Sequence, residues 1–269
     1  MKTRAITGVL FVVVLLAAVL ASAWTFALLF LIISLLSLQE FYRIVGTDGV
    51  KPNLLGGLAL GAGSFLAFVL PRLTDVDYSV LLYCIPLMTL IFWLELFRKE
   101  EKPFSNIAFS FLGVIFAVVP FIFFHELAYL SGSVYQYQYP MGFLIMLWAS
   151  DTGAYLAGRS FGKTKLFERH SPKKTWEGTI GGLVISGIAA FILSGSFPEV
   201  ETWRWLISSL IIVAFGTYGD LTESMLKRSY DIKDSGTILP GHGGLSDRFD
   251  SLLFVIPVIY VWLTLSGNI

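Results

Sequence analysis

Long stretches without a charged side chain restrict the fold of this 269-residue chain more than any other feature. These stretches are residues 5–39, 54–70, 78–94, 103–124, 127–150, 178–198, 205–219 and 251–269. The hydrocarbon core of a bilayer is about 30 Å thick, and about 20 helical residues cross it. Only 14% of the residues are charged, against about 25% in soluble domains. The sequence therefore predicts an all-α, polytopic integral membrane protein.

The charge-free stretches divide best into about nine transmembrane helices, because residues 5–39 are too long for one crossing. The predicted spans are 6–21, 24–38, 54–70, 78–97, 106–124, 140–158, 178–197, 205–222 and 251–267. Lys and Arg are enriched in cytoplasmic segments. With a cytoplasmic N-terminus, all but two of the 19 Lys and Arg residues fall inside. We therefore expect a helical bundle whose C-terminus lies outside.

The two halves of the chain differ in their polar content. Residues 1–140 are predicted to be a scaffold of transmembrane helices with lipid-facing and dimer surfaces. Residues 141–269 add two long polar inner segments, 151–177 and 220–250, which we predict to be catalytic. The net charge of zero argues against nucleic acid as a partner. The single cysteine, Cys84, excludes an internal disulfide and a thiolate metal cluster.

Acidic residues lie near the ends of two predicted spans, where an ionisable group is costly and is often functional. Residues 205–219 make only about 22 Å of helix, so this helix has to continue past Asp220. The span that begins near Pro140 has to continue past Asp151 for the same reason. Helical spacing then places four polar residues on one face: Asp220, Glu223, Ser224 and Lys227.

Carboxylates in this pattern predict a site for a hard cation. Mg²⁺ prefers oxygen ligands and takes one or two carboxylates together with substrate phosphates. The principal candidate ligands are Asp220 and Asp247, and the secondary candidates are Glu223, Asp250 and Asp151. The alternative is that these acids form structural salt bridges inside the bundle. We expect Mg²⁺, alone or with a second cation.

Basic and glycine-rich elements accompany these acids. Lys173 and Lys174 come directly before Thr175, near the predicted start of a helix, and helix N-termini favour anions. The segment Gly241–Gly244 has a flexible backbone that can surround phosphates. For any single Lys or Arg, membrane anchoring is the alternative explanation. Together these elements predict a phosphate-binding site at the inner face of the membrane.

The second polar segment carries a specific motif. Residues 224–250 are SMLKRSYDIKDSGTILPGHGGLSDRFD, with Ser, Lys-Arg, Lys-Asp, His-Gly-Gly and Asp-Arg-x-Asp in order. This pattern closely resembles the signature of the phosphatidate cytidylyltransferases, or CDP-diacylglycerol synthases. Residues 171–178 (SPKKTWEG) and the stretch from Asp151 to Gly162 are also similar to that family. Residues 1–140 contribute only compatible hydropathy.

The resemblance implies an enzyme of phospholipid biosynthesis that converts CTP and phosphatidate to CDP-diacylglycerol and pyrophosphate. It also implies a dependence on Mg²⁺, a homodimer, and an active site at the cytoplasmic face of the cell membrane. The expected catalytic residues are Asp220, Asp247, Lys173, Lys174, Lys227 and Arg228. The expected substrate-binding residues are Thr175, Ser224, Lys233, Asp234, His242, Gly243, Gly244 and Arg248.

Two other functions are compatible with parts of the sequence. A CTP-dependent lipid-alcohol kinase of the polyprenol type would share the nucleotide, the metal and the membrane, but it would need a base for the lipid hydroxyl. A secondary transporter would predict inverted repeats and acids near the membrane midplane. The ionisable groups here lie instead on one side of the membrane and mostly in the second half of the chain.

Overall fold

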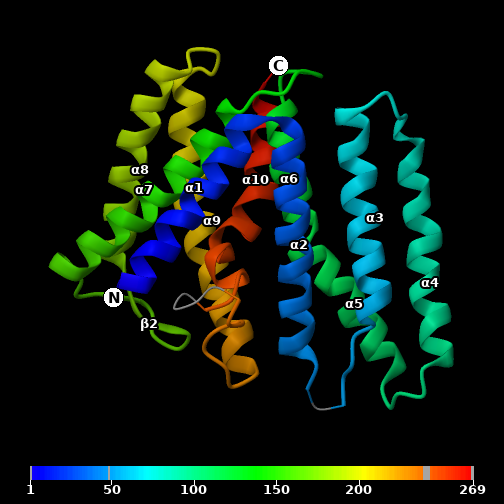
Figure 1. Ribbon diagram of the computed structural model, residues 1–269. Helices are drawn as coiled ribbons and strands as arrows, with labels where there is room; N and C mark the ends of the chain where they lie inside the picture. Colours follow the sequence, from blue (N-terminus) through cyan, green and yellow to red (C-terminus); the bar gives the residue numbers. More distant parts are fainter. Residues whose placement is uncertain (1, 48, 239–242, 268–269) are drawn as a thin grey trace. The chain divides into compact units, whose positions relative to one another are not determined.

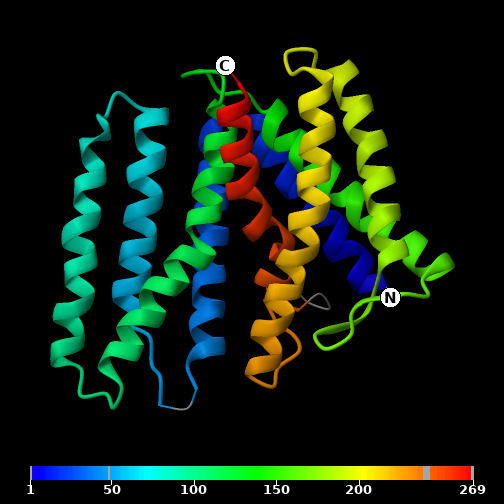
Figure 2. The same ribbon diagram turned by 180° about the vertical axis from the view of Figure 1, so that it is seen from behind.

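The computed structural model describes residues 2–47, 49–238 and 243–267 and is largely helical, which confirms the all-α class (Figures 1 and 2). The α-helices are α1 (Lys2–Ala21), α2 (Ala23–Val45), α3 (Leu54–Leu73), α4 (Cys84–Phe97), α5 (Pro103–Ala117), α6 (Val119–Glu126), α7 (Gln138–Phe161), α8 (Trp176–Ser196), α9 (Thr202–Ser229) and α10 (Asp250–Ser266). Short 3-10 helices are η1 (Tyr78–Tyr83), η2 (Leu127–Tyr129) and η3 (Ser246–Arg248). Strands β1 (Lys165–Phe167) and β2 (Ser171–Thr175) form an antiparallel hairpin.

Helices lie at the positions of the predicted spans. In the part of the chain that the structure describes, six helical segments are long and apolar enough to cross a membrane: α2, α3, η1 with α4, α5 with α6 and η2, α8, and α9. Residues Ile6–Ala21 of α1 and helix α10 are apolar but shorter. Helix α7 is outside that set, and its second half mixes Ser, Thr, Gly and charged residues. The chain is therefore an integral membrane protein by length and hydropathy, while nine crossings and the orientation of the termini stay predictions.

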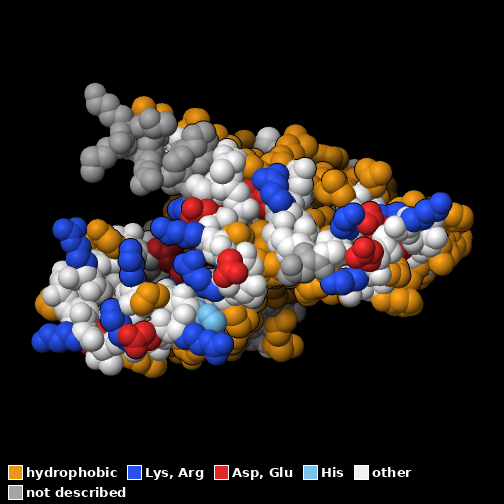
Figure 3. All heavy atoms as spheres, turned by 90° about the horizontal axis from the view of Figure 1, so that it is seen from below, with side chains coloured by type: hydrophobic (Ala, Val, Ile, Leu, Met, Phe, Trp, Pro, Cys, Tyr) orange, Lys and Arg blue, Asp and Glu red, His pale blue; other side chains and the backbone are white. Residues whose placement is uncertain are grey.

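Contacts divide the chain into two compact units. Unit 1 consists of Met1–Glu126 and Tyr230–Phe249, and unit 2 consists of Leu127–Ser229 and Asp250–Ile269. The predicted division at residue 140 separated a scaffold from the polar, catalytic part of the chain, whereas the two units are defined by their contacts. The predicted division therefore stays a prediction. Charged side chains gather on the face seen in Figure 3, in keeping with the segregation of charge along the sequence.

The core of unit 1 is built around α2. Phe26 and Phe30 of α2 are fully buried, and their rings contact Phe121 or Phe124 of α6 in tilted and edge-on arrangements. The α3 glycines permit close packing, because a Cβ at Gly57 would overlap the ring of Tyr42. The Tyr42 hydroxyl donates to the Ser110 carbonyl at 2.6 Å. These contacts give α2 a fixed position within its unit.

Small residues bring α7 and α8 of unit 2 close together. A Cβ at Gly153 would lie 2.6 Å from the carbonyl oxygen of Gly181, so glycine is needed for this approach. The hydroxyl of Thr175 caps α8 by accepting from the Gly178 N–H at 3.2 Å. The β1–β2 hairpin leads directly into this cap. Residues around Asp151, the end of the hairpin and the start of α8 are thereby held beside one another.

We expect the hairpin and the 230–238 segment to lie on the cytoplasmic side. Lys165→Cys and Lys233→Cys, each made in a Cys84→Ser background, place a thiol at an exposed position. A membrane-impermeant maleimide should label neither thiol in sealed cells but should label both after permeabilisation, because the positive-inside rule places these segments inside. Ser133→Cys, in a predicted outer connection, is the control that should react in sealed cells. Labelling of position 165 or 233 from outside would contradict the topology.

Candidate active site

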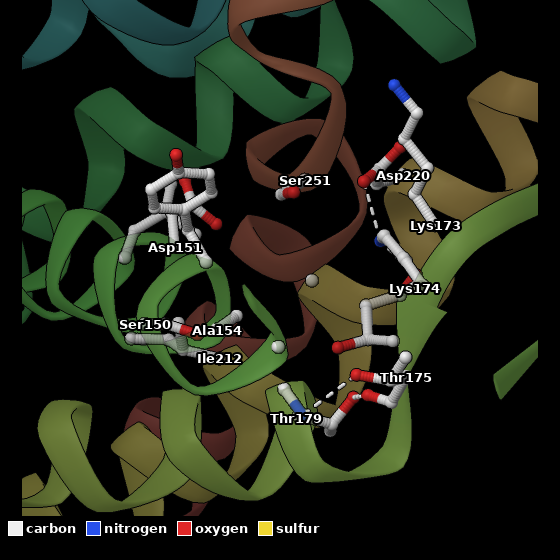
Figure 4. Close-up of a pocket in the computed structure, with 16 residues that line it drawn as sticks. Ser150, Asp151, Ala154, Lys173, Lys174, Thr175, Thr179, Ile212, Asp220 and Ser251 are labelled. Atoms are coloured by element: carbon white, nitrogen blue, oxygen red, sulfur yellow. Dashed lines mark hydrogen bonds and ion pairs between the residues drawn. The ribbon is translucent and has the colours of Figure 1, made fainter. Parts of the chain in front are cut away.

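A pocket of about 260 Å³ opens within unit 2, between α7, β2, the start of α8, and α9 (Figure 4). Five residues that the sequence predicted for the site line it: Asp151, Lys173, Lys174, Thr175 and Asp220. Further oxygen atoms on its wall come from Ser150, Thr179, Thr217 and Ser251. The first and second polar segments therefore both contribute residues to this pocket.

An ion pair between Lys174 and Asp220 joins two walls of this pocket. The Lys174 Nζ lies 2.5 Å from Oδ2 of Asp220, and it also donates to the Thr217 carbonyl oxygen at 3.3 Å. The two charged side chains are 25% and 31% exposed, so solvent reaches both. Lys174 lies on β2 and Asp220 lies on α9, so the pair depends on the packing of α8 and the hairpin against α9. A predicted phosphate-binding cation thus contacts a predicted metal ligand directly.

Asp151 adds a second carboxylate from α7. Figure 4 shows it on the wall opposite the Lys174–Asp220 pair. Asp151 interacts electrostatically with both Asp220 and Lys174. Asp250, the first residue of α10, interacts electrostatically with Asp220 and Asp151, and its Oδ1 accepts from the Ser251 N–H at 2.6 Å. Three predicted metal ligands of unit 2 are therefore within electrostatic reach of one another.

The donor chemistry of this group fits a hard divalent cation. Within residues 2–47, 49–238 and 243–267, no three His, Cys, Asp or Glu side chains are close enough to hold a metal by themselves. Mg²⁺ does not require such a cage, because it usually takes one or two carboxylates and completes its shell with substrate phosphates and water. Asp151 and Asp220 on the wall of an open pocket meet that requirement.

The C-terminal part of α9 carries the four-residue face predicted from helical spacing. The Ser224 hydroxyl donates to Oδ1 of Asp220 at 3.3 Å, and Lys227 Nζ lies 3.2 Å from Oε1 of Glu223. The Glu223 side chain is only 2% exposed, and its contact with Lys227 corresponds to the structural salt bridge considered as the alternative. Arg228 is exposed at the end of the same helix. The roles of Glu223, Lys227 and Arg228 in metal or phosphate binding stay predictions.

The hairpin that presents Lys173 and Lys174 is held by Glu177. Its carboxylate accepts from the backbone N–H of Thr164 at 3.1 Å and from that of Lys163 at 3.2 Å. The Trp176 N–H donates to the Thr164 carbonyl at 3.0 Å. These bonds close the hairpin onto the first turn of α8, so the two lysines reach the pocket from a fixed base. Lys173 is exposed, whereas Lys174 is partly buried.

The other predicted site residues belong to a loop of unit 1. Asp247 Oδ2 accepts from the backbone N–H of Gly244 at 2.8 Å and from that of Ser235 at 2.9 Å. Gly243 has φ of +83°, and a Cβ there would lie 2.7 Å from Asp247 Oδ2, so this position requires glycine. Three further predicted residues of this loop are exposed: Lys233, Asp234 and Arg248. His242 lies outside the described residues.

Asp220 belongs to unit 2 and Asp247 to unit 1, so the cation that we expect them to share stays a prediction. Each carboxylate already has a defined environment in its own unit. Asp220 faces a lysine in a pocket, whereas one oxygen of Asp247 organises a glycine-rich loop. Sequence reasoning missed Glu40, whose carboxylate accepts hydrogen bonds from the same loop. Its sequence signal is that it ends the first long charge-free stretch.

Comparisons with known proteins agree with these motifs. The sequence model of the Cytidylyltransferase family matches residues 2–266. Proteins named phosphatidate cytidylyltransferase are similar to this chain in Bacillus subtilis strain 168 (37% identical), Staphylococcus aureus strain COL (35%) and Staphylococcus haemolyticus strain JCSC1435 (33%). Each comparison covers 98% of this chain and 98% or 99% of the relative. The similarity therefore includes the N-terminal half, where the sequence offered no motif.

Proposed function

The chain belongs to the phosphatidate cytidylyltransferase family of CDP-diacylglycerol-forming membrane enzymes, and on that premise we propose a Mg²⁺-dependent in-line mechanism at the unit 2 pocket. An oxygen of the phosphatidate phosphate attacks the α-phosphorus of CTP. The bond between the α-phosphorus and the α,β-bridging oxygen breaks, and pyrophosphate leaves. The contact between Lys174 and Asp220 carries this proposal, because a cation suited to phosphate and a carboxylate suited to Mg²⁺ lie side by side in one open pocket.

Repulsion between two polyanions is the main obstacle to this reaction, so the work of the protein is positioning and charge neutralisation. Lys174 and Lys173 supply positive charge at the pocket, and α8 directs the positive end of its dipole to the same place. In the absence of substrate, Lys174 and Asp220 neutralise each other, and a phosphate of CTP competes with Asp220 for the lysine. The lipid phosphate is already an anion near neutral pH, so no strong general base is required.

The proposed cation is held by Asp220, with Asp151 or Asp247 as a second ligand. When bound, Mg²⁺ would neutralise part of the negative charge on the phosphate oxygens and so stabilise the pyrophosphate leaving group. Asp151 is suited to this role because it lines the same pocket as Asp220 and comes from a different helix. We include Asp250 as a further candidate because it interacts electrostatically with both.

The position of the pocket suits one lipid and one soluble substrate. It lies where α7, α8 and α9 carry their polar residues, and the hydrophobic parts of α8 and α9 are long enough to cross a membrane. The acyl chains of phosphatidate can remain in the bilayer while CTP enters from the cytoplasm. We include a homodimer in the proposal on the family resemblance, and the mass of the purified protein in detergent tests it.

The fate of the CTP phosphates distinguishes the proposed reaction from its closest alternative. With phosphatidate in mixed micelles, label from [α-³²P]CTP should enter the lipid fraction, and label from [γ-³²P]CTP should appear in pyrophosphate. Chelation of Mg²⁺ by EDTA should stop both, because Lys173 and Lys174 alone cannot offset the charge of the phosphates and of the pocket carboxylates. Entry of γ-label into a lipid alcohol would contradict the proposal and support the kinase. Full turnover in EDTA would contradict the metal dependence.

A further inference from the structure

Glu40 on α2 is a fully buried carboxylate that the proposed reaction does not use. Its Oε1 accepts from the Leu245 N–H at 2.8 Å, and its Oε2 accepts from the Ser246 N–H at 2.8 Å. The Ser235 hydroxyl lies 3.2 Å from Oε2. These partners are about 200 positions away in the sequence but belong to the same compact unit. Glu40 therefore connects a transmembrane helix to the glycine-rich motif loop within unit 1.

Glu40 is held by amide and hydroxyl donors rather than by a cation. Among the residues that the structure describes, no Lys, Arg or His forms an ion pair with it, although Arg43 follows one helical turn later. A buried carboxylate without compensation is expensive, and N–H donors to a charged acceptor make stronger hydrogen bonds than neutral pairs do. The ionised side chain thus requires the loop backbone to stay in place.

Glu40 and Asp247 share the donors of the loop. Three consecutive amides are divided between them, because the Gly244 N–H donates to Asp247 while the Leu245 and Ser246 N–H groups donate to Glu40. Ser235 is divided in the same way, with its N–H on Asp247 and its hydroxyl on Glu40. A displacement of the loop from one carboxylate therefore changes its geometry at the other.

Two glycines of the loop, Gly236 and Gly244, lie against the same carboxylate. A Cβ at Gly236 would lie 2.6 Å from Glu40 Oε1, and a Cβ at Gly244 would lie 2.8 Å from it. Both distances are too short for a real Cβ, and at Gly244 the Gly236 backbone nitrogen, 2.6 Å away, also leaves no room for one, so glycine lets the two backbone segments approach each other and Glu40. These two glycines thus allow the loop to contact the carboxylate of Glu40, in addition to any contact that the loop makes with substrate.

We infer that Glu40 is a positioning residue of the enzyme, which fixes residues 243–246 and the carboxylate of Asp247 for the reaction. The expected effect of Glu40 on turnover rests on the proposed function. The part that concerns the loop rests on the hydrogen bonds alone. Glu40 acts through the loop and contacts no reacting group in this proposal.

Hydrogen exchange and kinetics of the full-length protein in detergent test the inference with Glu40→Gln. This change keeps the size of the side chain but replaces the carboxylate by an amide. The amide NH₂ group cannot accept a hydrogen bond, so it would face one of the two backbone N–H donors without pairing with it. Exchange should rise in peptides that cover residues 235–247, and kcat/KM for CTP should fall by about 10- to 100-fold. The matched control is Glu95→Gln, since Glu95 is also buried in unit 1 but bonds to Asn106 and Arg98. It should leave exchange of the loop unchanged.

Several outcomes would overturn the inference. Unchanged exchange of residues 235–247 in a folded Glu40→Gln protein would show that the carboxylate does not hold the loop. Faster exchange with wild-type kinetics would show that the loop position does not matter for turnover. The product formed by the wild-type enzyme from labelled CTP tests the proposed function separately, and the exchange measurement needs no CTP.

A second variant covers the case in which Glu40→Gln does not fold. Ser235→Ala removes one donor to Glu40 and retains the buried charge and its two amide partners. It should raise hydrogen exchange of the loop and lower kcat/KM, and both effects should be smaller than those of Glu40→Gln. Wild-type exchange and kinetics in Ser235→Ala, combined with an unfolded Glu40→Gln, would assign Glu40 to folding alone.

Discussion

Asp220→Asn should lower kcat by at least about 10³-fold while the protein remains folded. The amide has nearly the same size as the carboxylate and can still accept from Ser224, which lies 3.3 Å away. It loses the negative charge that balances Lys174 and that would bind Mg²⁺. Initial rates with saturating CTP and phosphatidate, together with the melting temperature, measure the two effects separately. The matched control is Glu201→Gln, which directly precedes the N-terminus of α9 and should keep wild-type rates.

Asp247→Asn should have a loss of similar size, and the two losses should not multiply. If both carboxylates serve one cation, removal of either eliminates the same function, and residues that act as a unit cannot be lost twice. The double variant should therefore be about as slow as the slower single variant. A product of two independent losses would contradict a shared cation. In that case, Asp151 would replace Asp247 as the partner to test, since it lines the Asp220 pocket.

The helical fold could be predicted because the signal is repeated along the whole chain. Apolar stretches and segregated charge specify membrane helices locally, so α7, α8 and α9 lie near the positions predicted for spans. The β1–β2 hairpin was not predicted. It has only three and five residues in its strands, lies in a polar segment, and depends on the tertiary contact of Glu177 with Thr164. Such short elements leave no periodic pattern.

The candidate site was predicted as a set of residue types, but its pairings were not. Lys173 and Lys174 look equivalent in the sequence, whereas the structure distinguishes an exposed lysine from one that contacts Asp220. Glu40 was missed because nothing local marks its partners, and the nearby Arg43 suggests an ordinary surface ion pair. Its partners lie on a loop about 200 residues later. Long-range pairing of this kind is set by packing and cannot be obtained from residue spacing.

Lys174→Met should lower kcat/KM by about 10²- to 10³-fold, the usual loss when one group that stabilises transition-state charge is removed. Methionine retains the apolar stem and removes the ammonium that contacts Asp220 and Thr217. Lys173→Met should cost less than about 10-fold, because exposed ion pairs are worth at most about 1 kcal/mol. Lys165→Met, on the exposed face of the same hairpin, is the matched control and should keep wild-type kinetics. Equal losses at positions 165 and 174 would contradict a specific role for Lys174.

The combination of Lys174→Met with Asp220→Asn separates a catalytic pair from a structural salt bridge. Lys174→Met alone leaves a partly buried carboxylate without its cation and should destabilise the protein by about 1–3 kcal/mol. The double variant is neutral at both positions and should recover most of that stability. If the pair only supports the fold, turnover should recover together with the melting temperature. We expect the melting temperature to recover and turnover to stay lost, because the phosphate and the cation would each still lack the group that binds them.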